Sequence, residues 1–130
     1  MKPRYTTLIL LLLMPAITMA GPIDKVAELI KQGNTHAIAQ FFAASLDVSI
    51  MDNANVYSKQ QAELVLDKFF KENKPQAVKI IHRVNSNSSY NYAVLTMLTD
   101  KGKYRIAFTL KGTGEAMQMI ELRIETEKPN

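Results

Sequence analysis

The first half of the chain places its apolar residues at the spacing of α-helices. Between residues 22 and 32 they recur every three or four positions with charged residues opposite, which predicts an amphipathic helix. Asn34 is a favourable N-cap residue, and the apolar positions after it predict a second, short helix over residues 35–42. Residues 58–61, Ser-Lys-Gln-Gln, have the spacing of a capping box, so a third helix is predicted to begin there and to end before Pro75.

The second half of the chain changes from a period of 3.6 residues to a period of two. Apolar and polar residues alternate from Ala77 onward, as they do in half-buried strands, and one short alternating segment precedes the third helix. Residues 52–55, Asp-Asn-Ala-Asn, are turn formers between that segment and the helix. The predicted strands are residues 46–50, 77–84, 90–98, 104–111 and 116–125.

This order of elements predicts an α+β fold. Helices that come first and hairpins that come after favour an antiparallel sheet with the helices packed on one face. The alternation then assigns each strand residue to the helix side or to the outer face. The inward positions are Val78, Ile80, His82, Val84, Tyr104, Ile106, Phe108, Leu110, Ile120, Leu122 and Ile124. The outward positions of the last strand are Met117, Met119, Glu121 and Arg123.

The first twenty residues have the pattern of a secretory signal peptide. Lys2 and Arg4 precede an apolar run, residues 8–14, and small residues follow up to Ala20. The run is shorter than the roughly 20 residues of a membrane-spanning helix. We therefore expect cleavage after Ala20 and a periplasmic or secreted protein, with a retained N-terminal anchor as the alternative. Residues 21–127 would form a single domain, and residues 128–130 a frayed C-terminus.

Charge and cysteine content narrow the function classes. The net charge of +4 includes Lys2 and Arg4, which leave with the signal peptide, and the other basic residues are spread singly along the chain. The net positive charge that is left is small. It therefore predicts that the protein binds no nucleic acid, and that it binds no membrane after the signal is cleaved. The chain has no cysteine, which excludes disulfide bonds and thiolate chemistry. The domain must therefore be held together by its hydrophobic core.

Several short phrases of the sequence carry a resemblance to a known family. They are Val56-Tyr57-Ser58-Lys59, Phe69-Phe70-Lys71, Lys79-Ile80-Ile81-His82, Gly102-Lys103-Tyr104-Arg105 and Ile120-Glu121-Leu122-Arg123-Ile124-Glu125. Over residues 22–127 the chain resembles small exported bacterial domains of unknown function with a nuclear-transport-factor-2-like, cystatin-like fold. The resemblance implies a cone in which a curved, mostly antiparallel sheet wraps around N-terminal helices. It implies no activity.

The interior of such a cone is the first candidate site. A ketosteroid-isomerase-type enzyme needs an inward carboxylate as general base, and the alternation predicts none there. His82 is the inward residue that titrates near neutral pH, so it is a candidate base, a ligand anchor or an ordinary core histidine. The candidate pocket residues are Phe69, His82, Tyr92, Tyr104 and Phe108. The two histidines have no partner at ligand spacing, so neither a metal nor a cofactor is predicted.

The outer face of the last strand is the second candidate site. Met117 and Met119 are expected to project there beside Glu121 and Arg123, a combination that can form a partner surface or a homodimer interface. Three function classes remain. The first is a non-catalytic binding module with a small apolar or amphipathic ligand in the cone. The second is a homodimeric assembly protein that uses the outer face, and the third is an enzyme that relies on His82.

Overall fold

A computed structural model describes residues 21–85, 89–113 and 116–127. The predicted signal peptide, residues 1–20, and the predicted frayed end, residues 128–130, lie outside these ranges. The helices are α2 (Pro22–Gln32), α3 (Thr35–Ala39) and α4 (Lys59–Glu72). The strands are β1 (Phe42–Ile50), β2 (Asn53–Ser58), β3 (Pro75–Asn85), β4 (Tyr90–Thr99), β5 (Gly102–Lys111) and β6 (Gln118–Thr126).

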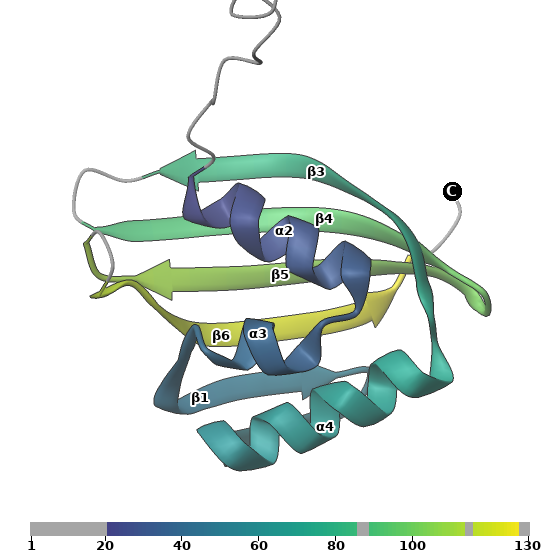
Figure 1. Cartoon of the computed structure of the whole chain (residues 1–130), viewed down its shortest axis with the longest axis horizontal. Helices are drawn as coiled ribbons and strands as arrows, with labels where there is room; N and C mark the ends of the chain where they lie inside the picture. The colour runs from purple at the N-terminus through teal and green to yellow at the C-terminus, as the bar shows by residue number, and fades with distance from the viewer. Residues whose placement is uncertain (1–20, 86–88, 114–115, 128–130) are drawn as a thin grey trace, which may run out of the picture.

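The six strands form one curved sheet, and the three helices lie on one of its faces (Figure 1). The strand order is β2-β1-β6-β5-β4-β3. Neighbouring strands are antiparallel except β1 and β6, which run parallel because the chain returns to the first hairpin at its end. The predicted α+β fold, with helices on one face of a mostly antiparallel sheet, is confirmed.

Local capping signals set the helix boundaries. Gly33 ends α2 in the left-handed conformation (φ 66°), and the Asn34 side chain accepts a hydrogen bond from the Ala37 N–H at 3.2 Å to begin α3. At the start of α4 the Gln61 N–H donates to Ser58 Oγ at 3.2 Å, and the Ser58 N–H donates to Gln61 Oε1 at 3.1 Å. The predicted capping box is therefore present. Within the described ranges, no helix combines the length and hydropathy needed to cross a bilayer.

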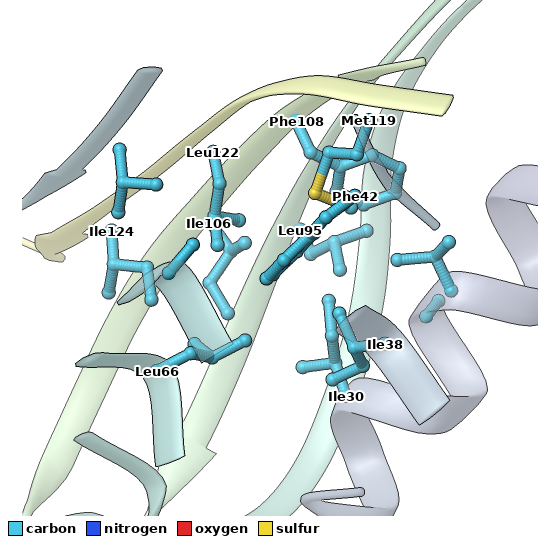
Figure 2. Packing of buried hydrophobic residues seen from close by; sticks show 14 of the residues in the cluster. Ile30, Ile38, Phe42, Leu66, Leu95, Ile106, Phe108, Met119, Leu122 and Ile124 are labelled. Carbon is cyan, nitrogen blue, oxygen red and sulfur yellow. The ribbon is translucent and has the colours of Figure 1, made fainter. Parts of the chain in front are cut away.

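The space between the helices and the sheet is filled by large apolar side chains (Figure 2). Phe42 and Phe108 meet there with aliphatic residues from all three helices and from the central strands. Among the fully buried side chains are Ile30, Ile38, Phe42, Leu66, Leu95, Met97, Ile106, Phe108, Leu110, Met119 and Ile124. This layer is the hydrophobic core that a domain without disulfides requires.

β2 is a strand that the sequence prediction missed. Residues 52–55 were expected to form a turn, but Met51 and Asp52 alone connect β1 to a strand that begins at Asn53. Met51 adopts a positive φ of 56°, which closes this tight hairpin. Five of the six β2 residues are exposed, so the strand has no alternating pattern by which to recognise it.

A β-bulge in β3 reverses the predicted faces of its second half. Ile80 pairs with Leu95, whereas His82 pairs with the next residue of β4, Val94, so Ile81 is an extra residue without a partner of its own. The alternation shifts by one position after it. The prediction that His82 points inward is therefore wrong: His82 lies on the outer face.

A second bulge does the same in β6. Thr109 pairs with Glu121, but the neighbouring Leu110 pairs with Met119, so Ile120 is the extra residue. Met119 turns into the core and is fully buried, and Met117 is half-buried against the same core. The prediction that these two methionines project from the outer face is wrong. Glu121 and Arg123, which follow the bulge, do lie on the outer face, where they line its hollows.

Candidate functional site

The five residues predicted to line one pocket lie on opposite faces of the sheet. Phe69, Tyr104 and Phe108 are on the helix side, and Phe108 is 0% exposed within the core. His82 and Tyr92 are on the outer face, where both are exposed. The structure therefore does not bring the five residues into a single pocket.

The helix-side residues hold the end of α4 against the sheet. The rings of Phe69 and Tyr104 make an edge-to-face contact with 5.1 Å between their centroids. Tyr104 Oη donates to Asn73 Oδ1 at 2.7 Å, and Asn73 Nδ2 donates to the Phe69 carbonyl at 3.0 Å. Asn73 is buried and both of its side-chain polar groups are satisfied by these bonds. The cluster connects β5 to the last turn of α4.

The outer face, meaning the strand side chains that point away from the helices, forms continuous rows across all six strands. Register pairs connect each member of a row to the next. The first row is Ala54, Ser49, Arg123, Ala107, Val94 and His82. The second row is Val56, Asp47, Glu121, Thr109, Tyr92 and Val84. Four of the predicted site residues, His82, Tyr92, Glu121 and Arg123, thus belong to one surface.

Two hollows lie on this face and share Arg123. The first, which we call the His82 hollow, has a volume of about 220 Å³ and is lined by His82, Tyr92, Val94, Arg105, Ala107, Arg123 and Glu125. The second, the Glu121 hollow, has a volume of about 560 Å³ and is lined by Asp47, Val48, Ser49, Ala54, Asn55, Val56, Glu121 and Arg123. In both, small or apolar side chains are surrounded by charged ones. Such a surface suits recognition of a partner that is apolar at its centre and polar at its rim.

Charges of both signs are paired across the outer face. Arg105 Nη2 lies 3.2 Å from Glu127 Oε2, and Arg123 Nη2 lies 3.6 Å from Glu125 Oε1. Thr109 Oγ1 donates to Glu121 Oε1 at 3.3 Å. Around the His82 hollow, the face therefore has no single-sign field that would select a strongly acidic or basic ligand.

His82 has no orienting contact of the kind that a general base needs. Among the residues that the structure describes, no hydrogen bond or ion pair involves its side chain. A catalytic histidine is normally held in position by a hydrogen bond to a third group. No observation therefore favours the enzyme hypothesis, which stays a prediction.

A groove on the helix side opens beside α4 at the β2 edge of the sheet. This α4 groove has a volume of about 270 Å³ and is lined by Val48, Ile50, Asn53, Tyr57, Val65, Lys68, Phe69 and Glu72. Its walls are mostly apolar, and Lys68 and Glu72 add one charge of each sign. Phe69 is the one predicted pocket residue that reaches it.

The sequence did not predict an ion pair that connects α2 to β3. Arg83 Nη2 donates to Asp24 Oδ1 at 2.6 Å, and Nη1 donates to Oδ2 at 2.9 Å. These hydrogen bonds hold the pKa of Asp24 below its usual value and raise the pKa of Arg83. Arg83 was predicted to point outward, and the bulge at Ile81 turns it toward the helix.

The prediction also missed Arg105, Val94 and Ala107, which complete the His82 hollow. Arg105 and Ala107 alternate with the inward residues of β5, so their outward position was available from the pattern. Val94 became a neighbour of His82 through the bulge in β3. Over the described ranges, no group of three or more His, Asp or Glu side chains is arranged to hold a metal ion.

Solved structures with the same fold share little sequence identity with this chain. A DUF4783 family protein from Bacteroides uniformis superposes with a TM-score of 0.77 at 16% identity and covers 84% of this chain and 100% of its own. A second family member, from Bacteroides ovatus, gives 0.74 at 18% identity and covers 80% and 94%. A cystatin-like domain of unknown function from Nostoc punctiforme gives 0.65 at 11% identity and covers 86% and 81%. These likenesses confirm the predicted nuclear-transport-factor-2-like, cystatin-like fold.

A comparison with curated proteins gives no match. The model of the DUF4783 family, described as a domain of unknown function, matches residues 23–125, which include all of the described helices and strands except their first residue, Pro22, and their last, Thr126. The resemblance that the sequence phrases indicated is therefore confirmed at the level of a family. The chain belongs to the DUF4783 family of domains of unknown function.

Proposed function

We propose that this protein is an exported, non-catalytic interaction module that forms a homodimer through the outer face of its sheet. The observation that carries the proposal is the composition of that face. Val94, which is 8% exposed, and half-buried Ala107 form an apolar floor at its centre, and Tyr92 and Val84 continue it toward β3 with 38% and 54% of their surfaces exposed. The three helices all lie on the other side of the sheet (Figure 1). Export is supported by the signal-peptide pattern of residues 1–20.

The charges around this centre suit a second copy of the same chain. Arg123 lies beside Glu125 and Arg105 beside Glu127, so each sign has its opposite close by. In a two-fold interface the same patch meets itself, and a charged patch can do so without net repulsion only if it carries both signs. A partner with one strong sign of charge would find no complementary field around this centre.

The packed interior also favours the outer face over a ligand in the cone. The positions that a ligand in the cone would need are filled by Phe42, Phe108 and Met119, each almost fully buried (Figure 2). A ligand there would have to displace close-packed core side chains, which is costly. A partner that binds the outer face would displace no core side chain.

The experiment is a measurement of molar mass by light scattering on the purified protein over a range of concentrations. We expect a dimer for the natural chain and a folded monomer for Tyr92→Asp, with an unchanged circular dichroism spectrum and an unfolding midpoint lower only by the stabilisation that dimerisation supplies. The matched control is Leu64→Asp, which puts the same charge on an exposed apolar residue of α4, away from the outer face. We expect this variant to remain a dimer. The proposal would be contradicted if the natural chain is monomeric at about 100 μM, because its dissociation constant would then be too weak for a specific interface. It would also be contradicted if Tyr92→Asp is a dimer.

A small apolar or amphipathic ligand in the α4 groove is the second candidate function. The observation that favours it is the apolar lining from Val65, Tyr57 and Phe69, with Lys68 at the rim for a polar end. Native mass spectrometry of the purified protein should then show an added mass of small-molecule size. The substitution Val65→Trp fills the groove and should remove this mass. An added mass that survives the substitution would locate the ligand elsewhere.

A further inference from the structure

The two edges of the sheet, β2 and β3, differ in how well they are protected against pairing with another strand. β3 begins at Pro75, which has no N–H to donate, and carries the charged residues Lys79 and Arg83. Its bulge at Ile81 interrupts the regular backbone, and Arg83 pairs with Asp24 of α2. Proline, charged residues and bulges are the devices by which natural sheets prevent edge pairing.

β2 has none of these devices. Its sequence, Asn-Ala-Asn-Val-Tyr-Ser, contains no charged residue, no proline and no glycine. All six residues pair with Ser45–Ile50 of β1 in an unbroken register, so the strand is regular along its whole length. Every second residue of such an edge strand directs its N–H and C=O away from the sheet. Among the described residues, the Ser58 N–H already donates to Gln61 Oε1 at the end of the strand, and no backbone–backbone hydrogen bond outside the sheet involves residues 53–57.

Hollows lie on both faces of the sheet beside this open edge, where they could receive the side chains of an added strand. The Glu121 hollow is lined by Ala54 and Val56 on the outer face, and the α4 groove is lined by Asn53 and Tyr57 on the helix side. The large apolar side chain with the greatest exposure on the sheet is Val56, at 68%. Leu64 of α4, at 71%, lies one turn before Lys68 of the α4 groove. A strand added beside β2 would cover apolar surface on both of its faces.

We propose that β2 is an acceptor edge for an extended segment of a partner protein, which adds a seventh strand to the sheet. In this recognition mode, backbone hydrogen bonds supply affinity and pockets for alternate side chains supply specificity. The segment has apolar residues at the positions that face the α4 groove and basic residues at the positions that face the outer side. This inference does not depend on the proposed homodimer, which uses the outer face and not the edge.

The preference for basic residues follows from two carboxylates beside β2. Asp47 and Glu121 are register partners on β1 and β6, so two like charges lie directly opposite each other. An added strand would lie two strand spacings, roughly 10 Å, from Asp47. A lysine or arginine side chain extends most of that distance along the surface. Its charge would reduce the repulsion between the two carboxylates, whereas an acidic segment would increase it.

The test uses a fluorescein-labelled peptide of about eight residues, the usual length of a strand, in which valine and lysine alternate. Fluorescence anisotropy should detect its binding to the purified protein. The variant Val56→Lys adds a charge to the open edge and should weaken binding about tenfold or more. Ala77→Lys adds the same charge at an exposed position of the other edge strand, outside the apolar patch proposed for the homodimer, and should change binding by less than about twofold.

Two modified peptides test whether the backbone forms the contact. One carries N-methyl groups on its valines and the other on its lysines, which removes the donors along one edge or the other. Strand addition requires that at least one of them loses binding. The proposal is overturned if both bind like the parent peptide, if Ala77→Lys weakens binding as much as Val56→Lys, or if no peptide binds at about 1 mM. It is also overturned if Val56→Lys dissociates a dimer of the natural chain and Tyr92→Asp does not, because the edge, and not the outer face, would then join two copies.

Discussion

Alternate residues of the same strands build two regions with different properties, the helix side and the outer face of the sheet. On β5, Phe108 is fully buried beneath the helices, whereas Ala107 and Thr109 on either side of it face outward. Burial of large apolar groups stabilises the helix side. The outer face has exposed aliphatic and tyrosine side chains between paired charges. The residues that stabilise the fold and the residues proposed for recognition are therefore separated by one position along each strand.

Two extra residues decide which side chains belong to each region. Ile81 in β3 moves His82 to the outer face and Arg83 to the helix side, and Ile120 in β6 moves Met119 into the core. Without these bulges the face proposed for recognition would lose His82 and gain a methionine. Bulges therefore decide which side chains lie on the face proposed for recognition.

The substitution Met119→Asp should have the largest effect, because the bulge in β6 places the Met119 side chain on the helix side and not on the outer face. An unpaired carboxylate in the core should lower the free energy of unfolding by more than about 4 kcal/mol and leave most of the protein unfolded. Chemical denaturation followed by circular dichroism measures this. The control is Gln118→Asp at the exposed neighbouring position, which should unfold within about 0.5 kcal/mol of the natural chain. Equal stabilities would mean that Met119 faces outward.

The substitution Phe108→Ala should have the next largest effect. Truncation of a fully buried phenylalanine leaves a cavity and typically costs about 3–5 kcal/mol. Tyr92→Ala removes an aromatic ring from the outer face of the adjacent strand and should cost no more than about 1 kcal/mol in the monomer. Denaturant midpoints of the two variants give the comparison directly. Similar losses from both would show that the outer face is packed as tightly as the core.

Signals that act within a few residues could be predicted from the sequence. The capping box at Ser58 and the left-handed Gly33 fix helix ends through contacts at most four residues away, and both are present. The alternation of β5 gave the correct face for Tyr104 and Phe108 because that strand is regular up to Thr109. These local signals were sufficient for the fold class.

Features that depend on pairing between strands could not be predicted in the same way. A bulge shifts the alternation of every later residue in its strand, and the pattern alone does not say where the extra residue is. Both bulges fall at adjacent apolar pairs, Ile80-Ile81 and Met119-Ile120, which interrupt an alternating run. Such pairs are the signal that could have found them. β2 was missed because an exposed edge strand needs no apolar face.

The substitution Tyr104→Phe should have a smaller effect, because it removes only a hydroxyl group on the helix side. The Tyr104 hydroxyl donates to Asn73 Oδ1, and Tyr104→Phe leaves this buried acceptor without its partner. We expect a loss of about 1 kcal/mol, since a neutral hydrogen bond contributes about that much. Thermal unfolding measures the change. Tyr90→Phe is the matched control on the exposed side of β4 and should have no measurable effect; a loss equal to that of Tyr104→Phe would remove the special role of the Asn73 contact.

The ion pair between α2 and β3 should give the smallest effect, one that depends on pH. Arg83 holds the pKa of Asp24 below its usual value of 3.8, so the carboxylate stabilises the fold above that pH and loses its contribution as the pH falls through the lowered value. Both side chains are about two-fifths exposed, so solvent screens the pair. Asp24→Asn should therefore lower the free energy of unfolding by less than about 1 kcal/mol at pH 7.

Denaturation of Asp24→Asn and of the natural chain at a series of pH values checks this origin of the effect. The difference between them should shrink as the pH falls below 3.8, because the natural carboxylate becomes neutral there as well. Glu28→Gln is the control on the same helix, since Glu28 accepts a long hydrogen bond of 3.4 Å from Gln32 and has no arginine partner among the described residues. It should change stability less than Asp24→Asn at pH 7. A difference for Asp24→Asn that stays constant down to low pH would mean that the shape of the side chain, and not its charge, holds α2 against the reversed end of β3.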